Sequence, residues 1–284
     1  MTGAPALWRI ERAGPQHPSA LPLIVNVPHA GTYLPPSIAA ALSPAGVAVP
    51  DTDWQVDKLC GFVPAMGATL MVATHSRFVV DLNRDPSGDA LYPGMSNTGI
   101  CPVASFADAP LYQPGRVPDQ AEIAARIDRY WRPYHRQLAA EIARIKAQHG
   151  VCILLDAHSI AGEVPRLFAG RLPDLNLGTA DGRSCAPPLA HAAFAVLSHA
   201  DGFTAVHNGR FKGGYITRHY GAPADDVHAL QLEMAQRCYM DESQPWHYDG
   251  SRAGALTAVL KTLVEQLLAG CAALGAETKK QDHC

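Results

Sequence analysis

The sequence predicts an α/β protein: a single three-layer domain, residues 1–284, in which helices cover both faces of a central mixed sheet. Short apolar runs typical of strands alternate along the chain with longer amphipathic runs typical of helices. Hydrophobic residues make up 48% of the chain and charged residues 17%, a composition typical of a compact globular protein. No internal repeat or low-complexity linker interrupts the alternation, so we expect one domain.

Six apolar runs predict the strands of this sheet. They cover residues 21–31, 68–76, 76–83, 151–159, 203–208 and 227–234. The run at 151–159, VCILLDAHS, is continuously apolar before its polar end. Such runs are typical of strands at the centre of a sheet that is covered on both faces.

Three segments predict helices. The first begins near Asp51 or Asp53, which are both good N-cap residues. The second covers residues 119–150, ends at Gly150 and contains Pro133, which predicts a kink or a break. The third is the amphipathic segment 253–275. Residues 86–117, rich in Gly, Pro, Ser and Asn, predict a long irregular excursion, which in a compact domain is usually functional or mobile.

The charge and the cysteines exclude several classes of protein. The formal net charge is -3 and the pI about 6.5, so no global positive field attracts nucleic acid or an anionic membrane. The seven cysteines are scattered without a C-x-x-C pair, which argues against a disulfide framework and a thiolate zinc site. We find neither a signal peptide nor a run of the roughly 20 apolar residues that a membrane span requires. We therefore expect a cytoplasmic protein without nucleic-acid or membrane partners.

Polar side chains collect where four of the predicted strands end. The first strand leads to His29, the third to Asn83 and Arg84, the fourth to Asp156 and His158, and the last to Glu233. In open α/β sheets, ligands bind beyond the carboxyl ends of the strands. We therefore expect these side chains to share one site.

His29 and His158 suit a divalent metal, most simply zinc, because imidazole is a common nitrogen ligand of Zn²⁺. A catalytic zinc site has three protein ligands and one open position, so a third ligand is required. We favour Asp53 as this third ligand, with Asp51 and Asp57 as alternatives in the same stretch, DTDWQVD. The competing interpretation is that the histidines are structural and the aspartates cap a helix.

Glu233 lies in the apolar run HALQLEMA, where an ionised carboxylate is costly without a partner or a function. It is either the general base beside a metal site or half of a salt bridge with a buried arginine. A serine hydrolase is disfavoured: Ser159 follows His158, but no G-x-S-x-G elbow is present.

Two basic stretches suit an anionic ligand. In RFVVDLNRDP, Arg77 and Arg84 flank an apolar run; the alternative is a solvated strand end. In HNGRFKGGYITRHYG, residues 207–221, basic side chains alternate with glycines and aromatic residues, as in a loop that closes over a ligand. Arginine forks match carboxylates in bidentate geometry, so we place Arg210, Arg218 and the aromatic Tyr215 among the substrate-binding candidates.

Six motifs in this chain together resemble the N-formylglutamate amidohydrolase family. They are VPHAGTYLP, DTDWQVDKL, THSRFVVDLNRDP, LLDAHSI, NGRFKGGYITRHYG and ALQLEMAQRCYMDE, and they extend from about Leu23 to about Glu242. The resemblance implies a zinc-dependent hydrolase of histidine degradation that releases formate and L-glutamate. More distantly, the pattern is similar to zinc carboxypeptidases and aspartoacylase, which implies a zinc-carboxypeptidase-like (phosphorylase/hydrolase-like) fold.

The resemblance also implies roles for residues. The two histidine ligands of those enzymes correspond to His29 and His158, their Asn-Arg pair to Asn83 and Arg84, and their catalytic glutamate to Glu233. Thr32 stands where the related enzymes have a glutamate ligand three residues after the first histidine, so the carboxylate ligand must come from elsewhere.

The implied substrate is a small anionic N-acyl amino acid. N-formylglutamate is a dianion, and Arg77, Arg84 and Arg218 supply cations for it, with Arg77 also able to polarise the scissile carbonyl. Two alternatives stay open at this point: a related zinc deacylase or carboxypeptidase with another substrate, and a non-enzymatic amino-acid-binding protein.

Overall fold

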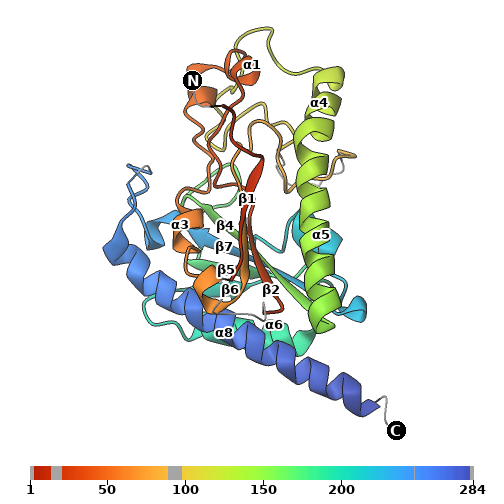
Figure 1. Ribbon diagram of the computed structural model, residues 1–284. Helices are drawn as coiled ribbons and strands as arrows, with labels where there is room; N and C mark the ends of the chain where they lie inside the picture. Colours follow the sequence, from red (N-terminus) through yellow and green to blue (C-terminus); the bar gives the residue numbers. More distant parts are fainter. Residues whose placement is uncertain (1–2, 14–20, 89–97, 246, 282–284) are drawn as a thin grey trace.

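The computed structural model describes residues 3–13, 21–88, 98–245 and 247–281. Its centre is a seven-stranded sheet in the order β1-β3-β2-β4-β7-β5-β6 (Figure 1). Strand β1 pairs antiparallel with β3, β5 pairs antiparallel with β7, and the other neighbours are parallel. The strands are β1 (Trp8–Glu11), β2 (Leu23–Val27), β3 (Thr69–Ala73), β4 (Cys152–Ile160), β5 (Leu175–Gly178), β6 (Ala205–His207) and β7 (Val227–Ala235).

Eight α-helices accompany the sheet in the described part of the chain. They are α1 (Pro36–Ala39), α2 (Pro44–Val47), α3 (Val56–Leu59), α4 (Gln120–Arg126), α5 (Arg132–His149), α6 (Pro187–Ser198), α7 (Tyr215–Tyr220) and α8 (Gly250–Gln281). Short 3₁₀ turns occupy Pro64–Met66, Pro223–Asp225 and Gln236–Cys238, and a π-helical turn, Ile127–Trp131, joins α4 to α5.

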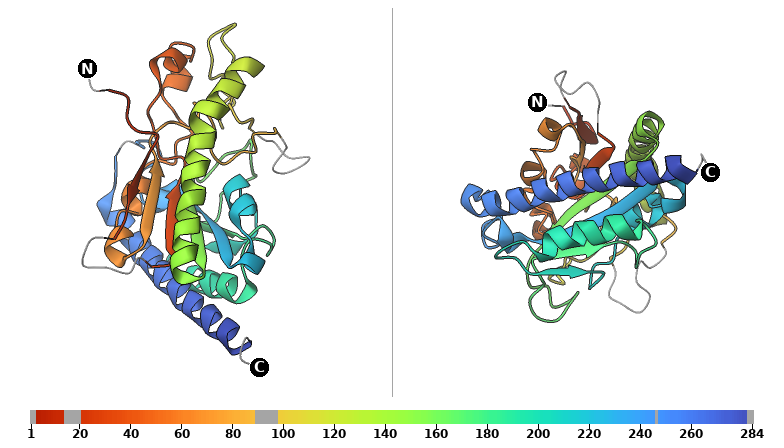
Figure 2. Two further views of the ribbon diagram at one scale, coloured as in Figure 1. Left: turned by 45° about the vertical axis from the view of Figure 1, so that its right-hand side comes forward. Right: turned by 90° about the horizontal axis from the view of Figure 1, so that it is seen from below.

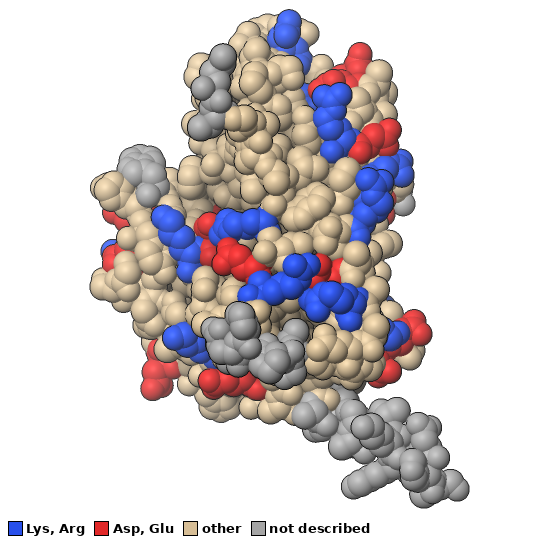
Figure 3. All heavy atoms as spheres, viewed as in Figure 1, with Lys and Arg blue, Asp and Glu red and all other residues tan. Residues whose placement is uncertain are grey.

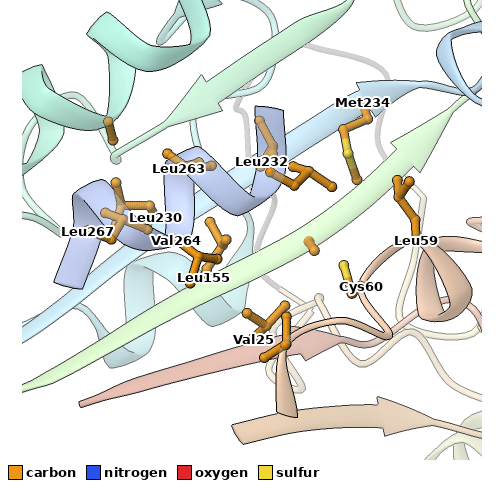
Figure 4. Packing of buried hydrophobic residues seen from close by; sticks show 14 of the residues in the cluster. Val25, Leu59, Cys60, Leu155, Leu230, Leu232, Met234, Leu263, Val264 and Leu267 are labelled. Carbon is orange, nitrogen blue, oxygen red and sulfur yellow. The ribbon is translucent and has the colours of Figure 1, made fainter. Parts of the chain in front are cut away.

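Helices cover the sheet on both faces, which confirms the predicted α/β architecture (Figure 2). On one face, α5 packs Tyr134 and Leu138 against Ile24 of β2 and Leu154 of β4. On the other face, α3, α6 and α8 cover the alternate residues of the same strands. Leu263, Val264 and Leu267 of α8 point toward the strand side chains in the close view of this cluster (Figure 4). The period-two alternation of β2 and β4 thus supplies two apolar layers.

By length and composition alone, helix α8 could also be a membrane-spanning helix. Its segment Gly250–Cys271 is long and apolar enough to cross a membrane, with a mean hydropathy of 1.2, which the sequence analysis did not anticipate. However, Leu256, Leu260 and Leu263 are buried against the sheet. A helix that covers a sheet on one side can be equally long and apolar; α8 packs one side on the sheet, and 33% of its apolar 18-residue stretch is buried.

The prediction of a strand at 76–83 is wrong. These residues form successive turns, in which Val79 N–H donates to the Ser76 carbonyl and Arg84 N–H to the Asp81 carbonyl. Phe78 and Val79 are buried in a separate cluster that also contains Ile38, Leu42, Leu111 and Tyr112. Apolar residues can be buried without joining a sheet, so the pattern alone did not distinguish a buried turn from a strand.

Three further differences concern the start of one helix, the continuity of another and elements that were not predicted. The first predicted helix begins at Val56, and neither Asp51 nor Asp53 caps it; its N-cap is Gln55. The helix around Pro133 does not break: the π-helical turn lies immediately before it, where Arg132 N–H donates to the Ile127 carbonyl. Proline lacks an N–H, and the wider turn accommodates this within a continuous helix. Strands β1 and β5 and helix α6 were not predicted.

Candidate active site

Three strands place their polar residues on one face and at one edge of the sheet, as expected. His29 follows β2, His158 lies near the end of β4, and Glu233 lies near the end of β7. His158 and Glu233 are paired neighbours in the parallel β4–β7 register. Because side chains alternate between the faces of a sheet, these two point to the same side.

His29, Asp53 and His158 form a buried group that could hold a metal ion. One ligand atom of each lies within 4.8 Å of the others. The Asp53 Oδ2 atom is 2.9 Å from His158 Nδ1 and 3.7 Å from His29 Nδ1. Asp53 reaches this position because its backbone N–H donates to the His29 carbonyl, which ties the two loops together. The structure thus favours Asp53 over its neighbours as a third ligand.

The other ring nitrogens of both histidines are held by buried carboxylates. His29 Nε2 lies 2.8 Å from Asp81 Oδ1, and His158 Nε2 lies 2.9 Å from Asp156 Oδ2. A carboxylate accepts the Nε2 proton and leaves the Nδ1 lone pair available, which is the usual arrangement of metal-binding histidines. His29 Nδ1 is buried without a hydrogen-bond partner. Two imidazole nitrogens and one carboxylate oxygen are a suitable ligand set for catalytic zinc, so the residues fit a divalent metal.

The charges of the site are strongly coupled. Burial on its own would raise the pKa of Asp53 and of Asp81, but the adjacent histidines and Arg77 outweigh it and lower both pKa values. Burial opposes a charged imidazole at His158, yet Asp156 and Asp53 raise its pKa well above the usual value. Each charge here is therefore stabilised by the others and not by solvent.

Arg77 is buried between these acidic groups. Its Nη2 donates to Asp81 Oδ2 at 2.6 Å, and its Nη1 lies 3.6 Å from Asp53 Oδ1. The guanidinium also lies over the Phe106 ring, 5.1 Å from its centroid. Arg77 is thus not at the entrance of a strand, as the sequence indicated, but is the cation that balances Asp53 and Asp81.

Glu233 lacks the salt bridge that the alternative interpretation required: no ion pair of Glu233 occurs among the described residues. Its side chain is only 7% exposed, and its closest polar contact is Gln231 Nε2, 3.4 Å from Oε2. Burial raises the pKa of Glu233 to about 8, with the charge of His158 acting in the opposite direction. A buried carboxyl with so high a pKa, close to a metal-type ligand group, is typical of a functional site.

A cavity of about 70 Å³ joins these groups. Its wall contains eight of the predicted site residues: His29, Asp53, Arg77, Asn83, Arg84, His158, Arg210 and Glu233. It also contains Thr98, Phe106, Gly214 and Gln231, which the sequence analysis did not select. Thr98 and Phe106 come from the described part of the 86–117 excursion, which has no helix or strand; its residues 89–97 lie outside the described residues.

Other predicted residues are elsewhere. Tyr215 and Arg218 lie on α7 and are not part of the described cavity wall. Tyr215 packs its ring on Trp131 and His219, and Arg218 Nε donates to the Gly213 carbonyl. A helix over 215–220 turns these two side chains away from the cavity, whereas Arg210 precedes the helix and reaches it.

The alternative aspartate ligands are also separate from the histidines. Asp57 pairs with Arg9 at 3.0 Å. Asp51 accepts a hydrogen bond from Phe106 N–H at 2.9 Å and faces a neighbouring cavity of about 230 Å³. Burial raises the pKa of Asp51 to about 6.

Asn83, Arg84 and Arg210 have partners within the protein. Asn83 Oδ1 accepts from Ile216 N–H at 2.8 Å, and its Nδ2 lies 3.0 Å from His158 Nε2. Arg84 donates to Thr98 through Nε and Nη2, and Arg210 Nε donates to the Leu167 carbonyl. The arginines are therefore held in place at the cavity wall by backbone and hydroxyl oxygens.

On the face shown in Figure 3, basic and acidic side chains are interspersed. This agrees with the mixed composition and the small net charge of the chain. The described residues on that face form no continuous basic surface of the kind that binds nucleic acid.

Comparisons with known proteins agree with the six motifs. The family model of N-formylglutamate amidohydrolase matches residues 21–240. N-formylglutamate deformylase of Pseudomonas aeruginosa is 48% identical over 249 residues, which cover 88% of this chain and 93% of that protein. The Pseudomonas putida enzyme of the same name is 44% identical over 253 residues, with coverages of 89% and 94%.

A solved structure is similar over almost the whole length. The crystal structure of N-formylglutamate amidohydrolase from Ralstonia eutropha JMP134 matches with a TM-score of 0.77 and 29% identity, covering 93% of this chain and 99% of that one. With a family model that spans most of the chain and two relatives above 40% identity, the chain belongs to the N-formylglutamate amidohydrolase family.

Proposed function

We propose that this protein is a metal-dependent hydrolase, most simply a zinc enzyme, that converts N-formyl-L-glutamate and water to formate and L-glutamate. The observation that carries the proposal is the buried His29–Asp53–His158 group beside Glu233 in a cavity with arginines in its wall. The names of the two Pseudomonas relatives support this substrate. The reaction fits the cytoplasmic degradation of histidine that the family resemblance implies.

His29, His158 and Asp53 would hold the metal. When bound there, a divalent metal supplies Lewis acidity, which makes water nucleophilic near neutral pH and polarises an amide carbonyl. Asp81 and Asp156 fix the histidine rings for this purpose by accepting their Nε2 protons.

Glu233 acts as the general base and then as the general acid. It takes a proton from the attacking water as oxygen adds to the formyl carbon, and gives it to the amine nitrogen as the C–N bond breaks. The raised pKa of about 8 makes Glu233 a stronger base than an ordinary carboxylate, and its place beside His158 in the sheet brings it to the ligand group. Arg77, at the cavity wall, stabilises the negative charge that develops on the carbonyl oxygen.

Arg84 and Arg210 bind the two carboxylates of the substrate, with Asn83 contributing an amide at the same wall. Their carbonyl and hydroxyl partners orient the guanidinium groups at the cavity wall. Arg218 and Tyr215, which we first grouped with them, support this wall from α7 and do not touch the substrate in this proposal.

The proposal is tested by metal analysis together with turnover of N-formyl-, N-acetyl- and N-succinyl-glutamate. We expect about one divalent metal ion per chain and the highest kcat/KM for the formyl substrate. Preference for another acyl group would instead identify a related deacylase. Binding of glutamate derivatives without metal or turnover would identify an amino-acid-binding protein.

A further inference from the structure

A row of four buried polar side chains leads from α5 along the face of the sheet that it covers to His158. The Tyr134 hydroxyl donates to Asn26 Oδ1 at 2.6 Å, and Asn26 Nδ2 donates to Asp156 Oδ1 at 2.8 Å. The second oxygen of Asp156, Oδ2, accepts from His158 Nε2 at 2.9 Å. Asn26 and Asp156 are directly paired in the β2–β4 register. The row therefore connects residues from three separate elements.

This row occupies positions where the fold itself requires only apolar residues. All four side chains are at most 3% exposed, and their neighbours on the same face of the sheet, such as Ile24 and Leu154, are apolar. A buried polar group costs free energy unless it is hydrogen-bonded, and here each partner satisfies the next. The row ends at His158, a member of the candidate metal-binding group, so it can serve that group as well as the packing of the core.

The chemistry of the groups fixes the direction of every hydrogen bond. A carboxylate only accepts, so Asn26 must present its NH₂ to Asp156 and its carbonyl oxygen to Tyr134. Tyr134 must then donate. For the same reason His158 must present Nε2–H to Asp156. In the metal-free site its Nδ1 also faces a carboxylate, Asp53 Oδ2 at 2.9 Å, and donates to it; a metal ion bound there would take the place of that proton.

The two histidines differ in what binds the second oxygen of the carboxylate that holds them. The carboxylate that holds His29 is bound on its other oxygen by the Arg77 cation. The carboxylate that holds His158 is bound on its other oxygen by the neutral Asn26, and the Asn83 amide adds a longer contact of 3.4 Å to Oδ2. Apart from His158 itself, the described side chains that orient Asp156 through hydrogen bonds are therefore neutral amides.

We propose that Asn26 and Tyr134 are positioning residues of the metal site: they fix the Asp156 carboxylate and, through it, the ring and the tautomer of His158. The inference rests on the metal site of the proposed function. Because neither residue touches the metal, the substrate or the cavity, their effect is transmitted entirely through Asp156.

The test measures Zn²⁺ affinity of the full-length metal-free protein by competition with a chromogenic chelator. Asn26→Leu keeps the side-chain shape and removes both hydrogen bonds, and we expect Zn²⁺ to bind about 10- to 100-fold more weakly. Tyr134→Phe removes one hydroxyl, and we expect about a 3- to 10-fold loss. Because the two act in series, the double variant is expected to lose no more than Asn26→Leu alone.

Tyr220→Phe is the matched control. It too removes a phenol hydroxyl near α5, from a side chain that is half-buried, but that hydroxyl bonds to His135 and not to this row. We expect its Zn²⁺ affinity to stay at the wild-type value, whatever its unfolding midpoint.

The proposal is overturned if Asn26→Leu and Tyr134→Phe lower the unfolding midpoint of the metal-free protein but bind Zn²⁺ as tightly as the wild type. The row is then only structural, and the proposed function still stands. If the wild-type protein binds no Zn²⁺ at all, both this inference and the proposed metal site are wrong. Losses that simply add in the double variant also contradict a relay in series.

Discussion

Arg77 is the residue whose removal gives the most informative test of the charge arrangement. The substitution Arg77→Met keeps much of the aliphatic length and removes the guanidinium, which lies 2.6 Å from Asp81 and 3.6 Å from Asp53. Both carboxylates are almost completely buried, so neither can recover its hydration in the folded state. Removing one partner of a buried pair typically costs about 3–5 kcal/mol. We expect a loss of that size at pH 8 in the metal-free protein.

The loss should depend on pH in a defined direction. In the wild type, the pKa values of Asp53 and Asp81 lie below the unfolded value of 3.8. Their stabilisation is therefore present above 3.8 and is lost only as the pH falls through the lowered values. Without Arg77, burial is less well compensated and the folded-state pKa of each carboxyl rises. Protonation then relieves part of the cost, so the destabilisation should be smaller at pH 5.5 than at pH 8.

Urea denaturation followed by circular dichroism at the two pH values measures this effect. With an m-value of about 3 kcal/mol/M, the expected loss moves the midpoint by about 1–1.7 M at pH 8. Arg126→Met is the control, because Arg126 is equally buried but its carboxylate partner Glu122 is 47% exposed and can return to water. If Arg77→Met lowers the free energy of unfolding by less than about 1 kcal/mol, or by the same amount at both pH values, Arg77 does not balance the charges of Asp53 and Asp81.

Three further predictions concern the site itself. Asp53→Asn should weaken Zn²⁺ binding in a chelator competition far more than Asp51→Asn or Asp57→Asn; equal retention in all three variants contradicts the ligand assignment. Glu233→Gln should lower kcat by roughly 10²–10⁴ with metal content and KM largely kept; unfolding with activity proportional to folded protein would make Glu233 structural. Gly214→Ala should lower kcat/KM because the new Cβ overlaps the Asn83 amide beside His158, whereas Gly254→Ala, with open space around it, should be neutral or slightly stabilising. Unchanged kcat/KM in Gly214→Ala would show that Asn83 can move freely.

Three of the site residues that the sequence predicted lie at or just beyond the ends of recognisable strands. His29, His158 and Glu233 follow from β2, β4 and β7, whose apolar runs are unambiguous, and parallel strands bring their carboxyl ends to one edge. Asp53 was selected because a metal site needs a carboxylate near His29, and the structure brings it there. Their functional roles are still predictions.

The parts that the sequence did not predict depend on contacts between distant residues. Asn26 and Tyr134 are 108 residues apart, and only the strand register and the position of α5 bring them together. Asp81 lies in the stretch RFVVDLNRDP. Its contacts with His29 and Arg77 depend on the turns at 76–83, which an apolar pattern cannot distinguish from a strand. The helix that carries Tyr215 and Arg218 outside the cavity wall was not predicted, because its six residues, rich in β-branched and aromatic residues, gave no clear helical periodicity.

The pairing of His158 with Glu233 across β4 and β7 has a consequence for how this fold can change its substrate. Neighbouring strands are held about 4.8 Å apart by backbone hydrogen bonds, so this spacing does not depend on any loop. Thr98, Phe106, Arg210 and Gly214, by contrast, enter the cavity from segments outside the sheet. Insertions and substitutions in those segments can reshape the pocket while the two strand residues keep their separation. A one-residue deletion within β7 is not tolerated in this way, because it turns Glu233 to the opposite face, among the leucines under α8.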